Sequence, residues 1–136
     1  MTIAAFALAL ATSPTAALAD EVVYVSSEKA AAATGVMTKG SDHIVIMSRR
    51  DGGGESEVHA GETDVFYVLE GSATFVTGGT VTGGKTTGPG QIRGTGISGG
   101  TSRTLSKGDV IVIPKGTPHW FKEVPEKVVY FVVKSI

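Results

Sequence analysis

The sequence contains no cysteine, which excludes disulfide bonds and thiolate metal sites and leaves the redox compartment undefined. It also lacks an excess of charge, because 12 Lys and Arg stand against 13 Asp and Glu, a formal net charge of -1. This balance gives no electrostatic basis for nucleic acid or an anionic membrane surface as a partner. The 136 residues fit one domain that is large enough to bury a core.

Charged side chains are missing from the first 19 residues, and the first charge is Asp20. The apolar run followed by small residues at 17–19 is typical of a secretory signal peptide with its cleavage site, although the usual Lys or Arg near the start is absent. We therefore predict a signal peptide over residues 1–19 and a secreted or periplasmic protein. The alternative is an N-terminal helix that packs on the domain. The run is too short, and too interrupted by Pro14, to favour a transmembrane span.

The rest of the chain indicates a mostly β protein after one short helix. Residues 27–34 suit a helix capped by Ser27 and ended by Gly35, within an N-terminal segment at residues 20–39. Across the predicted domain, residues 40–136, short β-branched runs alternate with turns, which favours an all-β, antiparallel jelly-roll or β-barrel fold. The predicted strands cover residues 43–49, 57–71, 72–77, 109–114 and 127–134.

Gly71 and the apolar run at residues 109–114 give two sharper predictions. Gly71 is expected to begin a turn, which makes residues 72–77 the hairpin partner of the strand before it. The near-continuous apolar run at 109–114 is typical of a strand that is buried on both faces.

Glycine and threonine dominate residues 78–102, where apolar side chains are few. A connection of this length is usually functional or disordered. It is predicted to be either a lid, with Gln91 and Arg93 as candidates for holding an anionic substrate, or a long exposed hairpin. Residues 94–99 match the G-x-G-x-x-G pattern, but no βαβ unit surrounds them, so a dinucleotide site is rejected.

Two strand-like segments each carry a histidine that can face the same interior. Glu57 and His59 are two residues apart and point to one side of a strand, as do His119 and Phe121 in the second segment. Asp64 follows His59 across a short turn. If the two segments are neighbours, these side chains converge inside the barrel as a metal site. Two carboxylates facing each other without a cation would repel, and one would have its pKa raised.

The two histidine segments also match a pair of known motifs. The second, of the form G-x5-P-x-G-x2-H-x3-N, is matched at Gly108, Pro114, Gly116 and His119, with Glu123 where Asn is usual.

The first motif, of the form G-x5-H-x-H-x(3,4)-E-x6-G, is matched less completely. His59 stands at its second histidine and Gly71 at its closing glycine. Asp64 stands at the glutamate position, and Glu57 stands where the first histidine would be. The sequence therefore resembles the cupin superfamily, as a small single-domain member with a degenerate first motif. The implied barrel runs from about residue 40 to the C-terminus.

This resemblance implies a mononuclear divalent metal, Fe, Mn, Zn or Ni, held by His59, His119 and Asp64, with Glu57 as a fourth ligand or a catalytic base. Asp is about 1.5 Å shorter than Glu, so Asp64 is expected to need a backbone shift to reach the metal. The implied activity is metal-assisted oxygenation or an isomerase or lyase step on a small molecule, in a homodimer. The alternative is a non-catalytic binding or storage barrel, with a structural metal or none.

Each of these side chains also has a structural interpretation. The two histidines would be packed imidazoles bonded to the backbone, Asp64 a turn cap, and Glu57 a solvated charge at a strand end. His43 has no partner motif and is predicted to lie at the surface or a strand edge. Phe66 and Phe121 are predicted to belong to the core. Trp120 is expected to face away from His119, between sheets or at a dimer contact.

Overall fold

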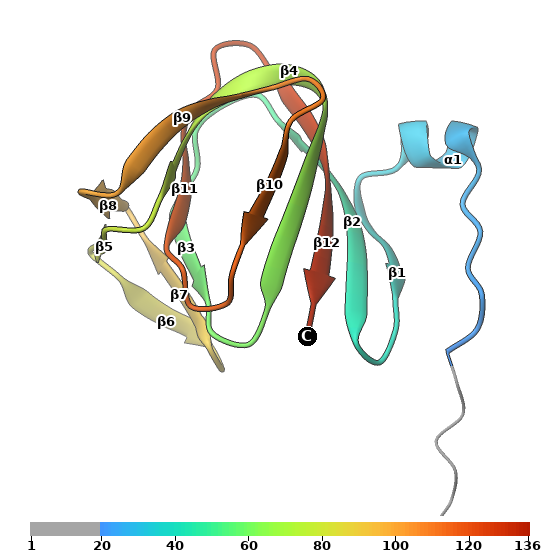
Figure 1. Cartoon of the computed structure of the whole chain (residues 1–136), viewed down its shortest axis with the longest axis horizontal. Coiled ribbons are helices and arrows are strands. Elements are labelled where there is room, and N and C mark those ends of the chain that lie inside the picture. The colour runs from blue at the N-terminus through green and yellow to red at the C-terminus, as the bar shows by residue number, and fades with distance from the viewer. Residues whose placement is uncertain (1–19) are drawn as a thin grey trace, which may run out of the picture.

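A computed structural model describes residues 20–136, so the predicted signal peptide at residues 1–19 lies outside the described part of the chain. Figure 1 shows strands that curl into a barrel, with α1 beside it. No helix among the described residues is long and apolar enough to cross a membrane. The elements are α1 (Ser27–Ala32), β1 (Gly35–Lys39), β2 (His43–Arg50), β3 (Ser56–His59), β4 (Thr63–Thr77), β5 (Thr80–Thr82), β6 (Lys85–Gly88), β7 (Gln91–Gly94), β8 (Gly96–Ser98), β9 (Thr101–Ser106), β10 (Val110–Ile113), β11 (His119–Glu123) and β12 (Val128–Ser135).

Two antiparallel layers form the barrel and share β4, which confirms the predicted all-β fold. One layer has the order β1-β2-β12-β4-β10, and the other has the order β6-β7-β3-β11-β4-β9. The helix prediction is confirmed over 27–32, but Ser26 rather than Ser27 caps it, and it ends before Gly35. Gly35 instead begins β1, which pairs with β2, so the segment at residues 20–39 contributes an edge strand.

β4 passes from one layer to the other at Gly71. Its first part pairs with β12 and β10, and residues 72–77 pair with β9 and β11. The predicted turn and hairpin at Gly71 are therefore wrong. A bend within one strand and a turn between two strands can both use the positive φ of a glycine, which is 75° at Gly71. A glycine in the sequence therefore does not show which of the two will form. A Cβ at Gly71 would lie 1.9 Å from the carbonyl oxygen of Lys127, which shows how closely β4 approaches the chain that leads into β12.

Residues 78–102 are built around one long hairpin, in which the pairing of β5 with β8 continues that of β6 with β7 and most side chains are exposed, so the second of the two predictions is confirmed. They form β5 to β8 and the start of β9, with β6 paired to β7 and β5 paired to β8. β7 continues the second layer by pairing with β3. Backbone hydrogen bonds hold these strands together, although the few apolar side chains of the stretch do not predict any strand. The rejected G-x-G-x-x-G pattern at 94–99 spans the end of β7 and all of β8, with no helix after it.

The core is built from aromatic side chains between the layers. Phe121 packs on Phe75 and Tyr130 with ring centroids 4.6 Å and 4.9 Å apart, and it stacks on Phe66 at 5.9 Å. The prediction that Phe66 and Phe121 belong to the core is confirmed. Trp120 faces away from them. Its Nε1 donates to the carbonyl of Gly54, and its ring lies against β8.

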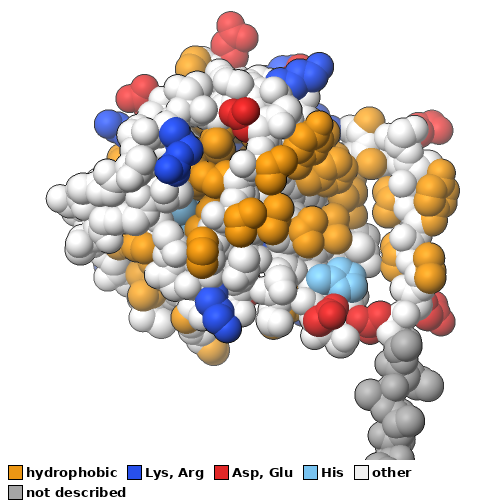
Figure 2. Space-filling model, viewed as in Figure 1, with side chains coloured by type: hydrophobic (Ala, Val, Ile, Leu, Met, Phe, Trp, Pro, Cys, Tyr) orange, Lys and Arg blue, Asp and Glu red, His pale blue; other side chains and the backbone are white. Residues whose placement is uncertain are grey.

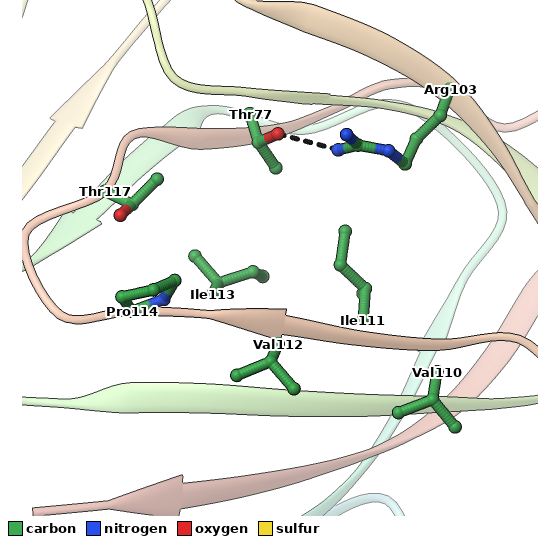
Figure 3. A pocket seen from close by; sticks show the side chains of 8 residues that line it. All are labelled: Thr77, Arg103, Val110, Ile111, Val112, Ile113, Pro114 and Thr117. Atoms are coloured by element: carbon green, nitrogen blue, oxygen red, sulfur yellow. Dashed lines mark hydrogen bonds between the residues drawn. The ribbon is translucent and has the colours of Figure 1, made fainter.

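β10 is buried on one face only, so the prediction of two buried faces is wrong. Val110 and Val112 are 62% and 57% exposed, whereas Ile113 is buried. Figure 3 shows Ile111 and Ile113 pointing toward Thr77 and Arg103, with the two valines on the other side of the strand. Figure 2 shows hydrophobic side chains gathered on the face in front of β10, β4 and β12.

Candidate metal site

The pairing of β3 with β11 places the two histidines side by side. Glu57 of β3 is the register partner of His119 at the start of β11. The turn after Pro114 delivers His119 to this position, and the amide of Gly116 in that turn donates to the carbonyl oxygen of His59 at 2.7 Å. The glycine and proline of the second motif thus fix one histidine relative to the other.

Four side chains converge in the barrel interior at this point. Oε2 of Glu57 lies 3.4 Å from Nε2 of His59 and 3.6 Å from Nε2 of His119. Oδ2 of Asp64 lies 3.6 Å and 3.8 Å from the same two nitrogens. Ligands at about 2.1 Å from a tetrahedral ion lie about 3.4 Å apart, so each carboxylate stands near ligand spacing from both imidazoles.

Both imidazoles are oriented by a hydrogen bond on the side away from this cluster. Nδ1 of His119 donates to the carbonyl of Thr117 at 3.0 Å, and Nδ1 of His59 donates to Oε1 of Gln91. In the neutral ring, the Nε2 lone pair then faces the cluster, which is the arrangement that metal-binding histidines adopt. Nε2 of His119 is buried and has no hydrogen-bond partner among the described residues. An unpaired buried acceptor is costly, so this atom fits a metal ligand.

Each carboxylate of the cluster is already paired with a cation of the chain. Arg93 of β7 donates to Oε1 of Glu57. Nζ of Lys134 in β12 donates to both oxygens of Asp64, at 2.9 Å and 3.1 Å, and also to Glu62 at 2.9 Å. The Lys134 and Asp64 side chains are only 14% and 3% exposed, so this is a buried ion pair.

The charges around the cluster shift two of its pKa values. Burial alone would raise the pKa of the Glu57 carboxyl, but the imidazoles of His119 and His59, together with Arg93, hold that pKa well below its usual range. The Glu57 carboxylate in turn raises the pKa of His59, although burial opposes this effect. For Glu57 the expected rise in pKa is therefore reversed, because the chain supplies the cations that the carboxylate needs.

The sequence profile of the family described as Cupin matches residues 31–135. This chain belongs to the cupin family. No curated protein sequence matches this cupin at a significant level.

Solved structures share the fold of this cupin at low sequence identity. An uncharacterized conserved protein with a double-stranded beta-helix domain from Klebsiella pneumoniae is 20% identical, with a TM-score of 0.52 over 76% of this chain and 75% of that one. KdgF from Halomonas sp. is 18% identical, with a TM-score of 0.54 over 74% of each chain. DMSP lyase DddQ from Ruegeria pomeroyi is 16% identical, with a TM-score of 0.51 over 71% of this chain and 40% of that one. At these identities the likeness shows the fold alone.

The structure thus brings together all four residues that the sequence singled out. Glu57 is not a solvated strand end, since its side chain is 17% exposed, and Asp64 caps no turn. Gln91, a candidate for holding substrate, instead orients His59. His43 lies at the first residue of β2 with a 39% exposed side chain, as predicted.

Lys134 is the main site residue that the sequence analysis missed, and a signal for it exists. Residues 128, 130, 132 and 134 share one face of β12, and the first three are buried in the core. A lysine that continues such an apolar row points into the barrel and needs a buried anion. Asp64 is the register partner of Lys134 on β4.

The cluster opens into a cavity of about 210 Å³ inside the barrel. Both histidines and both carboxylates line it, together with three cationic side chains and an aromatic and aliphatic wall that includes Ile46, Phe66, Phe121 and Val132. A second cavity, of about 360 Å³, lies under β10 and is drawn in Figure 3. It contains none of the four clustered residues, so the chemistry is associated with the first cavity.

Proposed function

We propose that this cupin binds one divalent transition metal through His59, His119 and Glu57 and uses it to act on a small molecule in the adjoining cavity. The observation that carries this proposal is the buried Nε2 of His119, which has no hydrogen-bond partner in the described structure. The ligand atoms of these three residues all lie within 4.8 Å of one another. A bound ion would polarise a substrate oxygen as a Lewis acid.

Asp64 has a different role from the other three residues in this proposal. Both of its oxygens are held by Lys134, so it binds the metal only if that ion pair opens. Two histidines and one carboxylate are a ligand set typical of Fe(II), and the second carboxylate also suits Mn(II). Zn and Ni remain candidates because imidazole suits both.

The electrostatics support Glu57 as a ligand rather than as a general base. Its pKa lies well below its usual range, and a carboxylate of such low basicity is a poor proton acceptor near neutral pH. Arg93 holds Oε1 and leaves Oε2 directed at the imidazoles. Of the two predicted roles of Glu57, catalytic base and metal ligand, the role of base is therefore less well supported.

The rest of the cavity limits what can react there. Aromatic side chains line one wall of it, and about 210 Å³ admits only a molecule smaller than a typical drug. The reaction we propose is metal-assisted oxygenation or an isomerase or lyase step. One protein of similar fold is named as a lyase, DMSP lyase DddQ, which supports the lyase alternative as chemistry that such a barrel can host.

Metal content tests this proposal directly. We expect the purified wild type to carry about one equivalent of a divalent metal by mass spectrometry, and the His59→Ala/His119→Ala double variant to carry almost none. His43→Ala is the matched control, because His43 is the third histidine and lies outside the barrel interior at the surface. If the wild type, loaded with Fe, Mn, Zn or Ni, retains no more metal than the double variant, the proposal is wrong.

A non-catalytic binding barrel is the second candidate, and Lys134 favours it. Its ammonium group already neutralises Asp64, so the carboxylate-rich interior is stable without an ion. The core aromatics do not fill the cavity, which therefore remains available to a ligand in both cases. Turnover of a bound small molecule by the metal-loaded protein would favour the enzyme. Binding without turnover would favour the binding barrel.

A further inference from the structure

Arg50 differs from the other two cations of the cavity. Arg93 is paired with Glu57, and Lys134 is paired with Asp64. No carboxylate of residues 20–136 lies within 4 Å of the Arg50 guanidinium, although Arg50 is half-buried and lines the same cavity. A guanidinium that is partly removed from water without an anion lacks the charge compensation that buried cations normally have.

The guanidinium of Arg50 is nevertheless held in one orientation. Its Nε donates to the hydroxyl of Tyr130 at 2.9 Å, and its Cζ lies 4.8 Å from the centroid of the Phe121 ring. Gly54 makes room for it, since a Cβ there would lie 2.6 Å from Nη1. The structure gives Nη1 and Nη2 no hydrogen-bond acceptor within the described part of the chain. These donors are thus fixed in place before any ligand arrives, which reduces the entropic cost of binding one.

Strand alternation explains why Arg50 and the metal cluster share a cavity. Ile46, Ser48 and Arg50 occupy the inward face of β2, and all three line the cavity with the histidines. Arg50 is the last residue of this row and lies at the end of β2. A molecule in the cavity can therefore meet Arg50 with one group and the imidazole cluster with another.

We propose that the ligand of this cavity is a small carboxylate whose acid group is held by Arg50. A planar guanidinium fork matches a carboxylate with two parallel hydrogen bonds, and one free cation balances one negative charge. The small volume, about 210 Å³, fits a short-chain acid. The inference rests on the proposed function for the other end of the molecule, which would present a polar group to the metal held by His59 and His119.

Calorimetric titration of metal-loaded protein with acetate, glycolate and succinate tests the proposal. We expect at least one of these acids to bind with a Kd of about 1 mM or tighter, and its amide to bind at least about tenfold more weakly. Arg50→Gln should weaken binding of that acid by at least about tenfold at unchanged metal content. Arg49→Gln is the matched control, because Arg49 is the adjacent arginine, is exposed and does not line this cavity, and it should change nothing.

Several outcomes would overturn the proposal. It is wrong if none of the three acids binds, if an amide binds as tightly as its acid, or if Arg50→Gln binds the acid as well as wild type does. It is also wrong if inorganic phosphate binds more tightly than every acid, since the site then selects a tetrahedral anion. Should Arg50→Gln fail to fold, Arg50→Lys replaces it and should still lose affinity, because it keeps the charge but not the fork. Metal content measured on the same samples separates failure of the metal site from failure of acid recognition.

Discussion

Replacing Lys134 by methionine should destabilise the metal-free protein strongly and make it more dependent on metal. The substitution keeps a long apolar stem but removes the ammonium that pairs with Asp64 and Glu62. Asp64 is 2% exposed, so its charge would then be buried without an ion pair. Breaking a buried pair by removing one partner costs about 3–5 kcal/mol.

The lower end of that range applies here because the Lys134 and Glu62 side chains retain 14% and 20% exposure. A loss of about 3 kcal/mol corresponds to a fall in Tm of roughly 10–15 °C for a domain of this size. The effect on metal binding has the opposite sign. Without the ammonium, Asp64 can act as a further ligand, and one of the three positive charges that line the cavity no longer opposes the ion. We expect the metal Kd to fall by at least about tenfold, which adds about 1.4 kcal/mol of metal-dependent stability at saturating metal.

Thermal unfolding of chelator-treated and metal-loaded protein measures both effects. Lys127→Met is the matched control, because Lys127 pairs with Glu70 at the surface, with both side chains more than half exposed. It should change Tm little in either state. The reasoning about Lys134 is refuted if metal-free Lys134→Met unfolds at the same temperature as the control, or if metal raises the Tm of the two variants equally.

Two further predictions concern the bend in β4 and the effect of pH. Gly71→Ala should lower the free energy of unfolding in urea by more than about 2 kcal/mol, because its Cβ would lie 1.9 Å from the Lys127 carbonyl oxygen. Gly108→Ala is the control: Gly108 also has a positive φ but has open space around it, so the loss should be about 1 kcal/mol. Equal losses would contradict the close approach at Gly71. The raised pKa of His59 stabilises the metal-free protein below pH 6.5, and this contribution is lost as the pH rises through the pKa that His59 has in the folded protein. A metal, in contrast, binds only the neutral imidazole. The metal-induced rise in Tm should therefore be larger at pH 8 than at pH 6, and a rise that does not depend on pH would count against His59 as a ligand.

The sequence predicted the parts of the fold that depend on local spacing. The Pro114 and Gly116 turn and the alternation of side chains on a strand set the direction of each histidine, and the motif resemblance supplied the expectation that His119 lies beside His59. The wrong predictions about Gly71 and about residues 109–114 concern pairing between distant segments. An apolar run at 109–114 does not reveal that β10 has one strand neighbour and leaves Val110 in water. Backbone pairing of β7 with β3 orders a glycine-rich stretch that has no hydrophobic pattern.

The two ligand candidates of the first motif illustrate the same limit. The spacing of the motif favours Asp64 over Glu57, because Asp64 occupies the usual carboxylate position. The structure gives the opposite order, since Lys134 holds Asp64 from 70 residues away in the sequence and leaves Oε2 of Glu57 directed at both imidazoles. Only the register of β12 against β4 makes this visible.

The pairing of Asp64 with Lys134 changes which observation supports a bound metal. Two facing carboxylates would argue for a cation on charge grounds alone, but Arg93 and Lys134 already meet that need for Glu57 and Asp64. Charge balance therefore gives little support for a bound cation. Within the cluster, the buried atom that has no hydrogen-bond partner among the described residues is Nε2 of His119. In the neutral ring that atom needs a proton donor or a metal, and the groups that face it are carboxylate oxygens, which in their ionised form only accept hydrogen bonds. Under the proposed function, a metal ion bound here would meet the imidazole of His119 and the oxygens of Glu57 and Asp64 together.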